Sequence, residues 1–331
     1  MISLKQQRVL SKIKEKNVEL GLDLTGYNIL TEVGSGEYVY TPIIAALANA
    51  NKIVAYTKDS RYGKASDIIE RCRIILKGIG LADKVEFYSD EVSKEHLENA
   101  DIITNSGFLR PLNKEKLQYL KKNAVIPLMY EKWELRDSDI DIDYCKLNKI
   151  RVAGTWENHP DLLVFNHVGP LAVKMSLNAG YEVYNNKIIV WSDDHFGEVA
   201  KKAFLSLGAK EVILTTNQDF LYKNIENVDF IYVCDYDEKR EYGSADFFDF
   251  KKLLKLNPDF GIVHLYGNIN YNKHKDSITT LYPSFDGFSS IMTYTLSHIG
   301  INPLINLQIS GFKVAESLHE NISCEFAQII K

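Results

Sequence analysis

Short apolar runs rich in β-branched residues alternate along this chain with segments of helical period. Six such runs come first, at residues 27–33, 52–57, 84–89, 100–106, 124–130 and 150–155. Five follow, at residues 187–192, 211–216, 228–235, 260–267 and 278–283. Strands of parallel sheets are buried on both faces and are joined by helices, so this alternation predicts an α/β fold. Two doubly wound domains are expected.

Residues 159–180 separate the two series of runs and predict one long, mostly buried helix. We therefore place a first domain at residues 1–158, an interdomain helix at 159–182 and a second domain at 183–309. The amphipathic tail, residues 310–331, is expected to form a helix that packs back on the first domain. No Pro-, Gly- or Ser-rich linker lies between the halves, so we expect a hinge and a ligand-binding cleft between the two domains.

The composition narrows the classes of partner. The formal net charge is −5 and both signs of charge are interspersed, which argues against a nucleic-acid-binding surface. No apolar stretch is long enough to span a membrane, and the N-terminal residues are charged rather than signal-like. The four cysteines are widely separated, so neither a disulfide framework nor a metal site is predicted. We expect a cytoplasmic protein that binds a small molecule, with no nucleic-acid or membrane partner.

Five segments carry a resemblance to a known family. They are residues 98–130 (ENADIITNSGFLRPLNKEKLQYLKKNAVIPLMY), 139–160 (DIDIDYCKLNKIRVAGTWENHP), 184–197 (YNNKIIVWSDDHFG), 233–242 (VCDYDEKREY) and 257–270 (NPDFGIVHLYGNIN). Their order and spacing resemble the D-2-hydroxyacid dehydrogenases and, more distantly, the S-adenosylhomocysteine hydrolases. The resemblance implies two Rossmann-type domains, NAD or NADP bound by the second domain, and a homodimer. It also implies a substrate that is a small hydroxy or oxo acid or a sugar-derived metabolite.

The predicted cofactor loop, WSDDHFG at residues 191–197, departs from the family's glycine-rich pattern. Glycines there let backbone N–H groups approach a pyrophosphate, whereas Asp193 and Asp194 place negative charge at that point. Asp at the start of a helix also predicts a plain N-cap. The family's catalytic Arg and His are missing too, because no Arg follows the run at 260–267 and Gln308 is the nearest polar match to the His. Retention of hydride transfer is therefore left open.

Ligands of open α/β sheets bind at the carboxyl ends of the strands, where polar residues gather in this sequence. In the second domain the predicted cofactor-binding residues are Asp194, His195, Phe196, Gly197, Thr216, Asp235, Tyr236, Tyr266, Gly267 and Asn268. The Gly267-Asn268 pair also has a plainer interpretation as a favourable turn. His264 lies within an apolar run and is more typical of a hydrogen-bonded core residue than of a ligand-binding one.

Two loops of the first domain favour an anionic or hydroxylated ligand. EVGSGEY, at residues 32–38, follows a strand and precedes a helix, as nucleoside- and phosphate-binding turns do. TKDSRYG, at residues 57–63, offers an acid and a cation after the next strand. The predicted substrate-binding residues are Gly34, Ser35, Gly36, Asp59, Arg61, Asn105, Ser106, Gly107 and Trp156. The alternative is that the glycines only shape a tight turn.

The densest unusual composition lies beside the predicted hinge, in the stretches MYEKWELRDSDIDID and GTWENHP. Aromatic faces, both signs of charge and an imidazole at strand ends are informative about function. We predict His159 or Glu131 as the catalytic acid–base residue, with Arg136 or Lys132 as its electrostatic partner. The alternative is hinge packing, in which two tryptophans fill the space between the domains and the charges are solvated.

Three functions fit these observations. The first is an NAD(P)-dependent oxidoreductase of the hydroxyacid-dehydrogenase type. The second is a diverged protein with two Rossmann domains that binds a nucleotide or metabolite without hydride transfer. The third is an S-adenosylmethionine-dependent methyltransferase, suggested by ILTEVGSGEYVYTPIIAALANANKIVAYTKDS taken alone. A strand series that continues without a final antiparallel hairpin disfavours the third function, and the overall plan favours the first.

Overall fold

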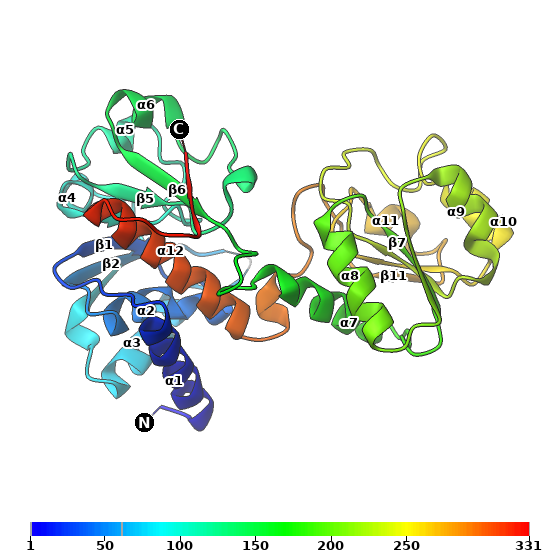
Figure 1. Ribbon diagram of the computed structural model, residues 1–331, viewed down its shortest axis with the longest axis horizontal. Helices are drawn as coiled ribbons and strands as arrows, with labels where there is room; N and C mark the ends of the chain where they lie inside the picture. Colours follow the sequence, from blue (N-terminus) through cyan, green and yellow to red (C-terminus); the bar gives the residue numbers. More distant parts are fainter. Residues whose placement is uncertain (1, 61, 331) are drawn as a thin grey trace. The chain divides into compact units, whose positions relative to one another are not determined.

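The computed structural model describes residues 2–60 and 62–330, which form two compact units (Figure 1). Unit 1 contains the chain up to Val164 together with the part from Ile301 onward. Unit 2 is Phe165–Gly300. The chain therefore builds most of the first unit, forms the second, and then returns to complete the first.

Unit 1 is built on a seven-stranded sheet in the order β12-β6-β5-β4-β1-β2-β3. The strands are β1 (Asn28–Glu32), β2 (Lys52–Tyr56), β3 (Val85–Tyr88), β4 (Ile102–Ile103), β5 (Val125–Pro127), β6 (Arg151–Thr155) and β12 (Ala327–Ile329). The first six are parallel, and β12 runs antiparallel beside β6. The parallel strands stand in the order 3-2-1-4-5-6, which is that of dinucleotide-binding sheets. This order reverses between β1 and β4.

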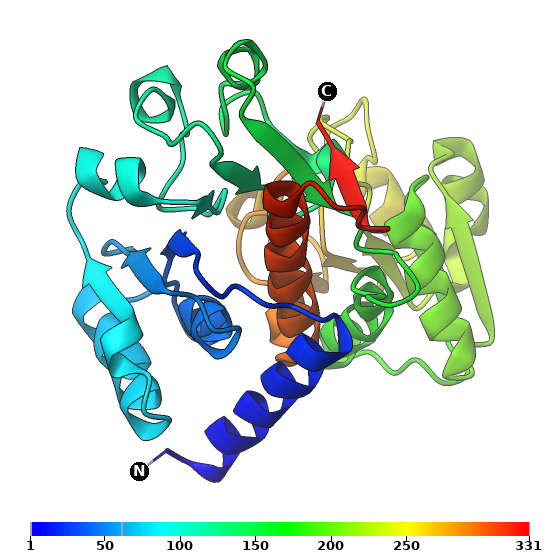
Figure 2. The same ribbon diagram turned by 60° about the vertical axis from the view of Figure 1, so that its left-hand side comes forward.

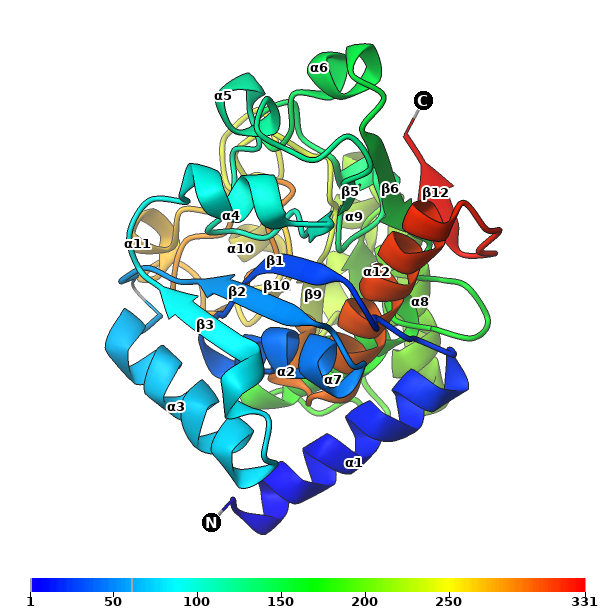
Figure 3. The same cartoon turned by 90° about the vertical axis from the view of Figure 1, so that its left-hand side faces the viewer.

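Helices surround this sheet. They are α1 (Leu4–Glu19), α2 (Thr41–Leu47), α3 (Ala65–Gly78), α4 (Lys94–Asn99), α5 (Lys114–Leu117), α6 (Ile142–Leu147) and α12 (Asn302–Glu320). Leu97 of α4, Leu117 of α5 and Cys145 of α6 are buried in one core with strand residues such as Ile103 and Ile126. α12 packs along β5 and β6, with α1 and α2 against it (Figures 2 and 3). The apolar strand runs are thus covered by helices, as parallel sheets require.

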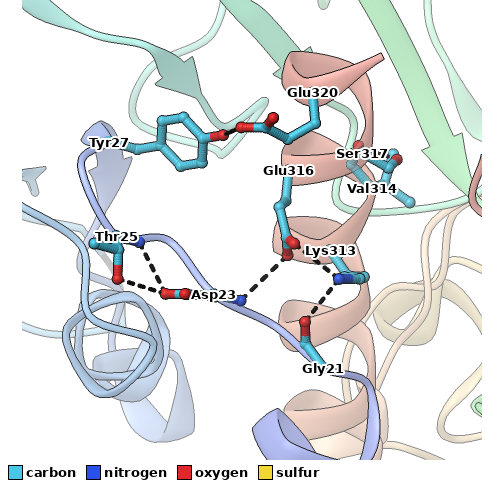
Figure 4. Close-up of polar contacts among 9 residues, drawn as sticks. All are labelled: Gly21, Asp23, Thr25, Tyr27, Lys313, Val314, Glu316, Ser317 and Glu320. Carbon is cyan, nitrogen blue, oxygen red and sulfur yellow. Dashed lines mark hydrogen bonds and ion pairs between the residues drawn. The ribbon is translucent and has the colours of Figure 1, made fainter. Parts of the chain in front are cut away.

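Polar contacts anchor α12 to the segment that precedes β1 (Figure 4). Lys313 Nζ donates hydrogen bonds to Gly21 O at 2.7 Å and to Glu316 Oε1 at 2.8 Å. The Tyr27 hydroxyl donates to the Glu320 carboxylate. Burial, together with that carboxylate, raises the pKa of Tyr27. A helix from the end of the sequence is therefore fixed to the beginning of the fold.

Unit 2 is built on a five-stranded parallel sheet in the order β11-β10-β9-β7-β8. The strands are β7 (Lys187–Trp191), β8 (Glu211–Thr215), β9 (Phe230–Val233), β10 (Gly261–His264) and β11 (Thr280–Tyr282). The helices are α7 (Val168–Asn178), α8 (His195–Ser206), α9 (Gln218–Asn224), α10 (Phe250–Leu256) and α11 (Tyr271–His274). Counted within the unit, the strand order is 2-1-3-4-5, the flavodoxin-like arrangement, and it reverses between β7 and β9. Phe204 and Tyr232 belong to one core of this unit, and Trp191 and Phe248 to the other.

The two sheets confirm the predicted α/β class with two Rossmann-like domains. Two of the expected helices are shorter than predicted. The one expected at residues 159–180 begins only at Val168, because Leu163 has a φ of 46° and the residues around it form turns. The tail helix expected at residues 310–331 begins earlier, at Asn302, and ends at Glu320, where Asn321 takes a left-handed conformation with a φ of 57°. The tail then continues as strand β12, which pairs with β6 across a long stretch of sequence rather than through a hairpin.

A helix must be both long and apolar to span a bilayer. None of the helices within residues 2–60 and 62–330 is long and apolar enough to cross a membrane.

Candidate functional site

Carboxyl groups gather at the carboxyl ends of the strands of unit 1. Glu32 ends β1, Glu131 and Glu134 follow β5, and Glu157 follows β6. Tyr38 lies in the turn after β1. Burial and the negative charges of Glu32, Glu157 and Glu134 raise the pKa of its phenol to about 12. Groups from three strand ends therefore meet around one tyrosine. Glu32, Tyr38, Glu131, Glu134 and Glu157 are called the carboxylate cluster below.

Burial and mutual repulsion favour the protonated forms of three of these carboxyl groups. Burial, reinforced by the charges of Glu134 and Glu131, raises the pKa of Glu157 well above its ordinary value. Burial also raises the pKa of Glu134 to about 7, and the charge of Glu131 acts in the same direction. The pKa of Glu32 is raised by burial, although N–H groups of the β4 loop and the charge of Arg110 oppose the shift. The cluster can therefore hold or release a proton near neutral pH.

Glu131 links three segments of unit 1 through hydrogen bonds. Its Oε1 accepts from Glu157 N at 2.8 Å. Its Oε2 accepts from Trp133 Nε1 at 2.9 Å and from Gln328 Nε2 at 3.3 Å. Its own N–H donates to Glu134 Oε1 at 3.3 Å. The predicted acid–base residue Glu131 thus lies within the cluster, where it joins the loops after β5 and β6 to the strand β12.

A second polar network lies at the ends of β4 and β5. Asn105 Nδ2 donates to the Tyr130 hydroxyl at 2.6 Å, and that hydroxyl donates to Asp139 Oδ2 at 2.7 Å. Arg110 Nε donates to Asn105 Oδ1 at 3.2 Å, and the guanidinium lies 5.1 Å from the centroid of the Tyr130 ring. The predicted substrate-binding residue Asn105 therefore organises this loop and holds a cation, Arg110, beside the carboxylate cluster.

The Gly-Ser-Gly turn joins β1 to a short 3-10 helix and to α2. A Cβ on Gly34 would lie 2.7 Å from Tyr38 Cβ, so the turn can close on Tyr38 only with glycine there. Gly36 has a φ of 58° and open space where a Cβ would stand. A Cβ on Gly107, in the β4 loop, would lie 3.3 Å from Glu32 Oε2. Gly34 is thus required by a close contact and Gly36 by its positive φ, and the space beside Gly36 leaves that side of the turn open.

In the predicted cofactor loop of unit 2, the carboxylate of Asp194 accepts hydrogen bonds from the backbone N–H groups of the loop. Asp194 caps α8, and its Oδ1 accepts from Phe196 N at 2.8 Å and from Gly197 N at 3.3 Å. Its Oδ2 accepts from Tyr236 N at 2.9 Å. N–H groups at a helix N-terminus are the donors that bind a pyrophosphate in Rossmann folds. Here a side chain of the same charge sign satisfies them, which fits the capping interpretation of Asp194.

Negative charge and aromatic rings surround that loop. Burial and the charges of Asp193, Asp194 and Glu238 raise the pKa of Asp235 to about 7. The ring of Phe196 stacks on that of Tyr236 at 5.8 Å between centroids, and Tyr266 packs edge-on against both. His195 lies 4.6 Å from Phe165 between ring centroids. Most residues predicted to bind the cofactor thus lie in the segments after β7, β9 and β10, where Phe196, Asp235 and Tyr266 are buried.

The other predicted catalytic residues lie in unit 1. His159 is buried, with its ring against Trp156 at 5.1 Å and against Phe326 at 5.6 Å. Trp156 itself is 40% exposed. Arg136 is exposed and lowers the pKa of Glu134 through its charge. Of this set, Arg136 acts on the carboxylate cluster, whereas His159 belongs to an aromatic group beside it.

The remaining predicted substrate-binding residues occupy loops after β2 and β4. Asp59 is exposed, and its Oδ1 accepts from Ala65 N at 2.8 Å, at the start of α3. Arg61 lies outside the described residues. The hydroxyls of Ser106 and Thr104 are hydrogen-bonded at 2.7 Å and are both buried. Asp59 is therefore the predicted residue of this group that faces solvent.

Three further residues that the sequence singled out are Thr216, Asn268 and Gln308. Thr216 follows β8 at the edge of its sheet. Asn268 Nδ2 donates to Lys239 O at 3.3 Å, as a turn residue does. Gln308 is buried and accepts from Thr41 Oγ1 at 3.1 Å. Gln308, the nearest match to the family's catalytic His, is thus bonded within the fold of unit 1.

Sequence reasoning missed Glu32, Tyr38, Glu134 and Arg110. Glu32 and Tyr38 flank the glycines of EVGSGEY, and a carboxylate that ends an apolar run was a signal for Glu32. Glu134 and Arg110 gave no local signal, since the groups that define their surroundings come from other strand ends. Among the described residues, no group of three or more His, Cys, Asp or Glu could hold a metal ion.

Comparison with known proteins bears on the fold. No protein-family model and no curated protein match this sequence. A dipicolinate synthase polypeptide from Bacillus halodurans is similar in structure, with a TM-score of 0.52 and 13% identity over 89% of this chain and 99% of that chain. Its counterpart from Bacillus subtilis gives 0.52 and 13% over 91% and 98%. The pyruvate reductase of Chlamydomonas reinhardtii gives 0.51 and 10% over 92% and 99%.

This chain shares with these three proteins a fold of two Rossmann-like domains. The predicted resemblance is thereby confirmed at the level of the fold. At these identities the likeness says nothing of which substrate this chain takes.

Proposed function

We propose that this protein is an NAD(P)-dependent oxidoreductase whose nucleotide binds unit 1, at the carboxyl ends of β1 and β4. The observation that carries this proposal is the strand order of unit 1, because dinucleotides bind where the order 3-2-1-4-5-6 reverses. The Gly-Ser-Gly turn follows β1 at that point. Asp59 comes about 20 residues later, where an acidic residue binds the ribose in dinucleotide-binding folds.

A nucleotide fits unit 1 better than the loop of unit 2 that the family resemblance implies. A pyrophosphate after β7 would have to displace Asp194 from three N–H groups and approach Asp193 and Asp235. The turn of unit 1 has open space beside Gly36. Since α2 has only 7 residues, we expect the turn backbone rather than a helix dipole to contact the phosphates.

The carboxylate cluster offers the proton transfer that must accompany hydride transfer. NAD(P), when bound, supplies the hydride acceptor or donor. An acid–base group works best when its pKa lies near the working pH, and the pKa of Glu134 is about 7. We propose that Glu134 exchanges a proton with a substrate oxygen and that buried Glu157 shares it. A small hydroxy or oxo acid, or a sugar-derived metabolite, is the substrate class that suits this chemistry.

Titration calorimetry with NAD, NADP and S-adenosylmethionine tests the proposal. We expect one nicotinamide cofactor to bind, Gly36→Ala to weaken it at least tenfold, and Asp194→Ser to leave it unchanged. Gly26→Ala is the matched control, because Gly26 also has a positive φ, of 87°, and open space around it but lies before β1. Binding of neither nicotinamide cofactor would contradict the proposal, as would a loss that Gly26→Ala reproduces.

A second candidate is a protein that binds a nucleotide or metabolite without hydride transfer. It is favoured by Gln308, the nearest polar match to the family's catalytic His, which lies within α12 and accepts a hydrogen bond from Thr41. Nucleotide binding without any absorbance change at 340 nm, across a panel of hydroxy and oxo acids, would select this candidate. Binding of S-adenosylmethionine alone would instead restore the methyltransferase alternative.

A further inference from the structure

The loop that carries Glu131 and Glu134 is held by a side chain from the other end of the sequence. Gln328, on β12, accepts from Lys132 N through its Oε1 at 2.7 Å, across 196 residues of sequence. Its Nε2 donates to Glu131 Oε2 at 3.3 Å. One planar amide therefore bonds both the backbone and a carboxylate of the same loop.

Two further features bring β12 and this loop together. Gln328 is in register with Gly154 of β6, and a Cβ on Gly154 would lie 2.6 Å from Lys132 N. The loop can therefore pass directly over β6 only because residue 154 is glycine. Lys132 Nζ also donates to Ile329 O at 2.9 Å. Both Gln328 of β12 and Lys132 of the loop thus contribute side-chain hydrogen bonds to this contact.

We propose that Gln328 is a positioning residue of the carboxylate cluster, which fixes Glu131 at a set distance from Glu134 and Glu157. For its effect on catalysis this inference rests on the proposed function. An amide suits the role because it presents one donor and one acceptor on a single rigid group. Met has nearly the same length but makes neither bond, and Glu cannot donate when ionised.

The charges around Glu134 decide the direction of the effect. Charged and titratable groups at four strand ends act on the cluster: Glu32 at the end of β1 and Tyr38 after it, Arg110 after β4, Glu131 and Arg136 after β5, and Glu157 after β6. The backbone N–H of Glu131 and the charges of Arg136 and Arg110 lower the pKa of Glu134, whereas the charge of the Glu131 carboxylate raises it. Without Gln328 the Glu131 carboxylate keeps its bonds to Glu157 N and Trp133 Nε1 but loses one of its three donors, so its charge can move away from Glu134 while the two cations stay in place. We therefore expect loss of Gln328 to lower the pKa of Glu134.

β12 has other attachments that keep it in place when Gln328 changes. Its backbone pairs with β6, Trp156 N donates to Phe326 O at 2.8 Å, and Ile330 N donates to Val152 O at 3.0 Å. Gln328 itself is only partly buried. Gln328→Met should therefore fold, and Gln328→Ser offers a smaller replacement if the larger side chain disturbs packing.

Ile329→Ala is the matched control, because Ile329 is 46% exposed and bonds Lys132 through its backbone oxygen only.

The test is an NMR titration of 13C-labelled glutamate carboxyl groups in the full chain without ligand. We expect Gln328→Met to move the Glu134 midpoint from about 7 toward its ordinary value of 4.5, while Ile329→Ala leaves it in place. In a Glu131→Gln background, Gln328→Met should cause no further shift, since Gln328 acts through Glu131. An unmoved midpoint in a folded Gln328→Met or Gln328→Ser variant would overturn the proposal, and so would an equal shift in both backgrounds.

This experiment separates the inference from the proposed function, because the titration needs neither cofactor nor substrate. If nicotinamide cofactors fail to bind but the midpoint moves, the positioning role stands and the proposed function falls. If activity is found, the acidic limb of its pH profile should shift in the same direction in Gln328→Met, with kcat affected more than KM.

Discussion

Replacing Asp194 by Ala should destabilise unit 2 by about 1 to 3 kcal/mol net. The carboxylate accepts N–H groups of Phe196 and Gly197 at the start of α8, and loss of such a cap costs about 1 kcal/mol. It also accepts the N–H of Tyr236 at 2.9 Å, and an N–H group left without an acceptor costs about 1 to 3 kcal/mol. Relief of the repulsion that raises the pKa of Asp235 offsets part of this loss.

The assay is urea unfolding followed by far-UV circular dichroism, together with the fluorescence of Trp191, which is buried at the end of β7. Asp193→Ala is the control, because Asp193 carries the same charge next to Asp194 but is exposed, and Asp194 takes the helix cap. We expect the control to change stability by less than about 0.5 kcal/mol. Equal stabilities of the two variants would refute the view that Asp194 seals the loop, and would return the phosphate site to unit 2.

Three further predictions concern pH and the anchoring of α12. Because the pKa of Glu134 is raised to about 7, its proton stabilises the fold below pH 4.5 and that stability is lost as pH rises to 7; Glu134→Gln should remove this pH dependence of urea-derived stability, which is at most about 3 kcal/mol. His264 behaves oppositely: burial lowers its pKa to about 4, so stability falls as pH drops from 6.5 toward 4, by at most about 3 kcal/mol, and His264→Phe should remove this loss. Lys313→Ala removes the hydrogen bond from α12 to Gly21 and should lower the free energy of unfolding by about 1 kcal/mol. Lys12→Ala removes an exposed hydrogen bond from α1 to Asn302 of α12 and should change it by less than half of that.

The strands were predictable because burial on both faces demands unbroken apolar runs. KIVAYT, for example, became β2, and KIIVWS became β7. The ends of the helix expected at 159–180 were not predictable, since the turns before Val168 depend on a left-handed residue, Leu163, that is neither Gly nor Asn. The strand β12 was missed because it is a strand only by pairing with β6.

The candidate site was partly readable from sequence. The turn EVGSGEY and residue Glu131 stood out as unusual local compositions at strand ends. The raised pKa of Glu134 could not be predicted from the sequence, because it arises from burial and from the charge of Glu131, both of which depend on the tertiary structure. Likewise the sequence presented Asp194 as either a cap or a cofactor residue, and only the structure gives its hydrogen bonds to the N–H groups of Phe196, Gly197 and Tyr236.

By itself the sequence determined the local properties of this protein: the α/β class, the positions of its strands, and the polar residues that follow them. These depend on side-chain burial within a few residues, and that leaves a pattern in the chain. The tertiary structure decided which strands are neighbours, and with them that unit 1 has the 3-2-1-4-5-6 order and unit 2 the flavodoxin-like one. Strand pairing and charge proximity depend on contacts across long stretches of sequence, as between β1 and β4 or between Gln328 and Glu131. Such contacts leave no local pattern, and they moved the proposed nucleotide site from one unit to the other.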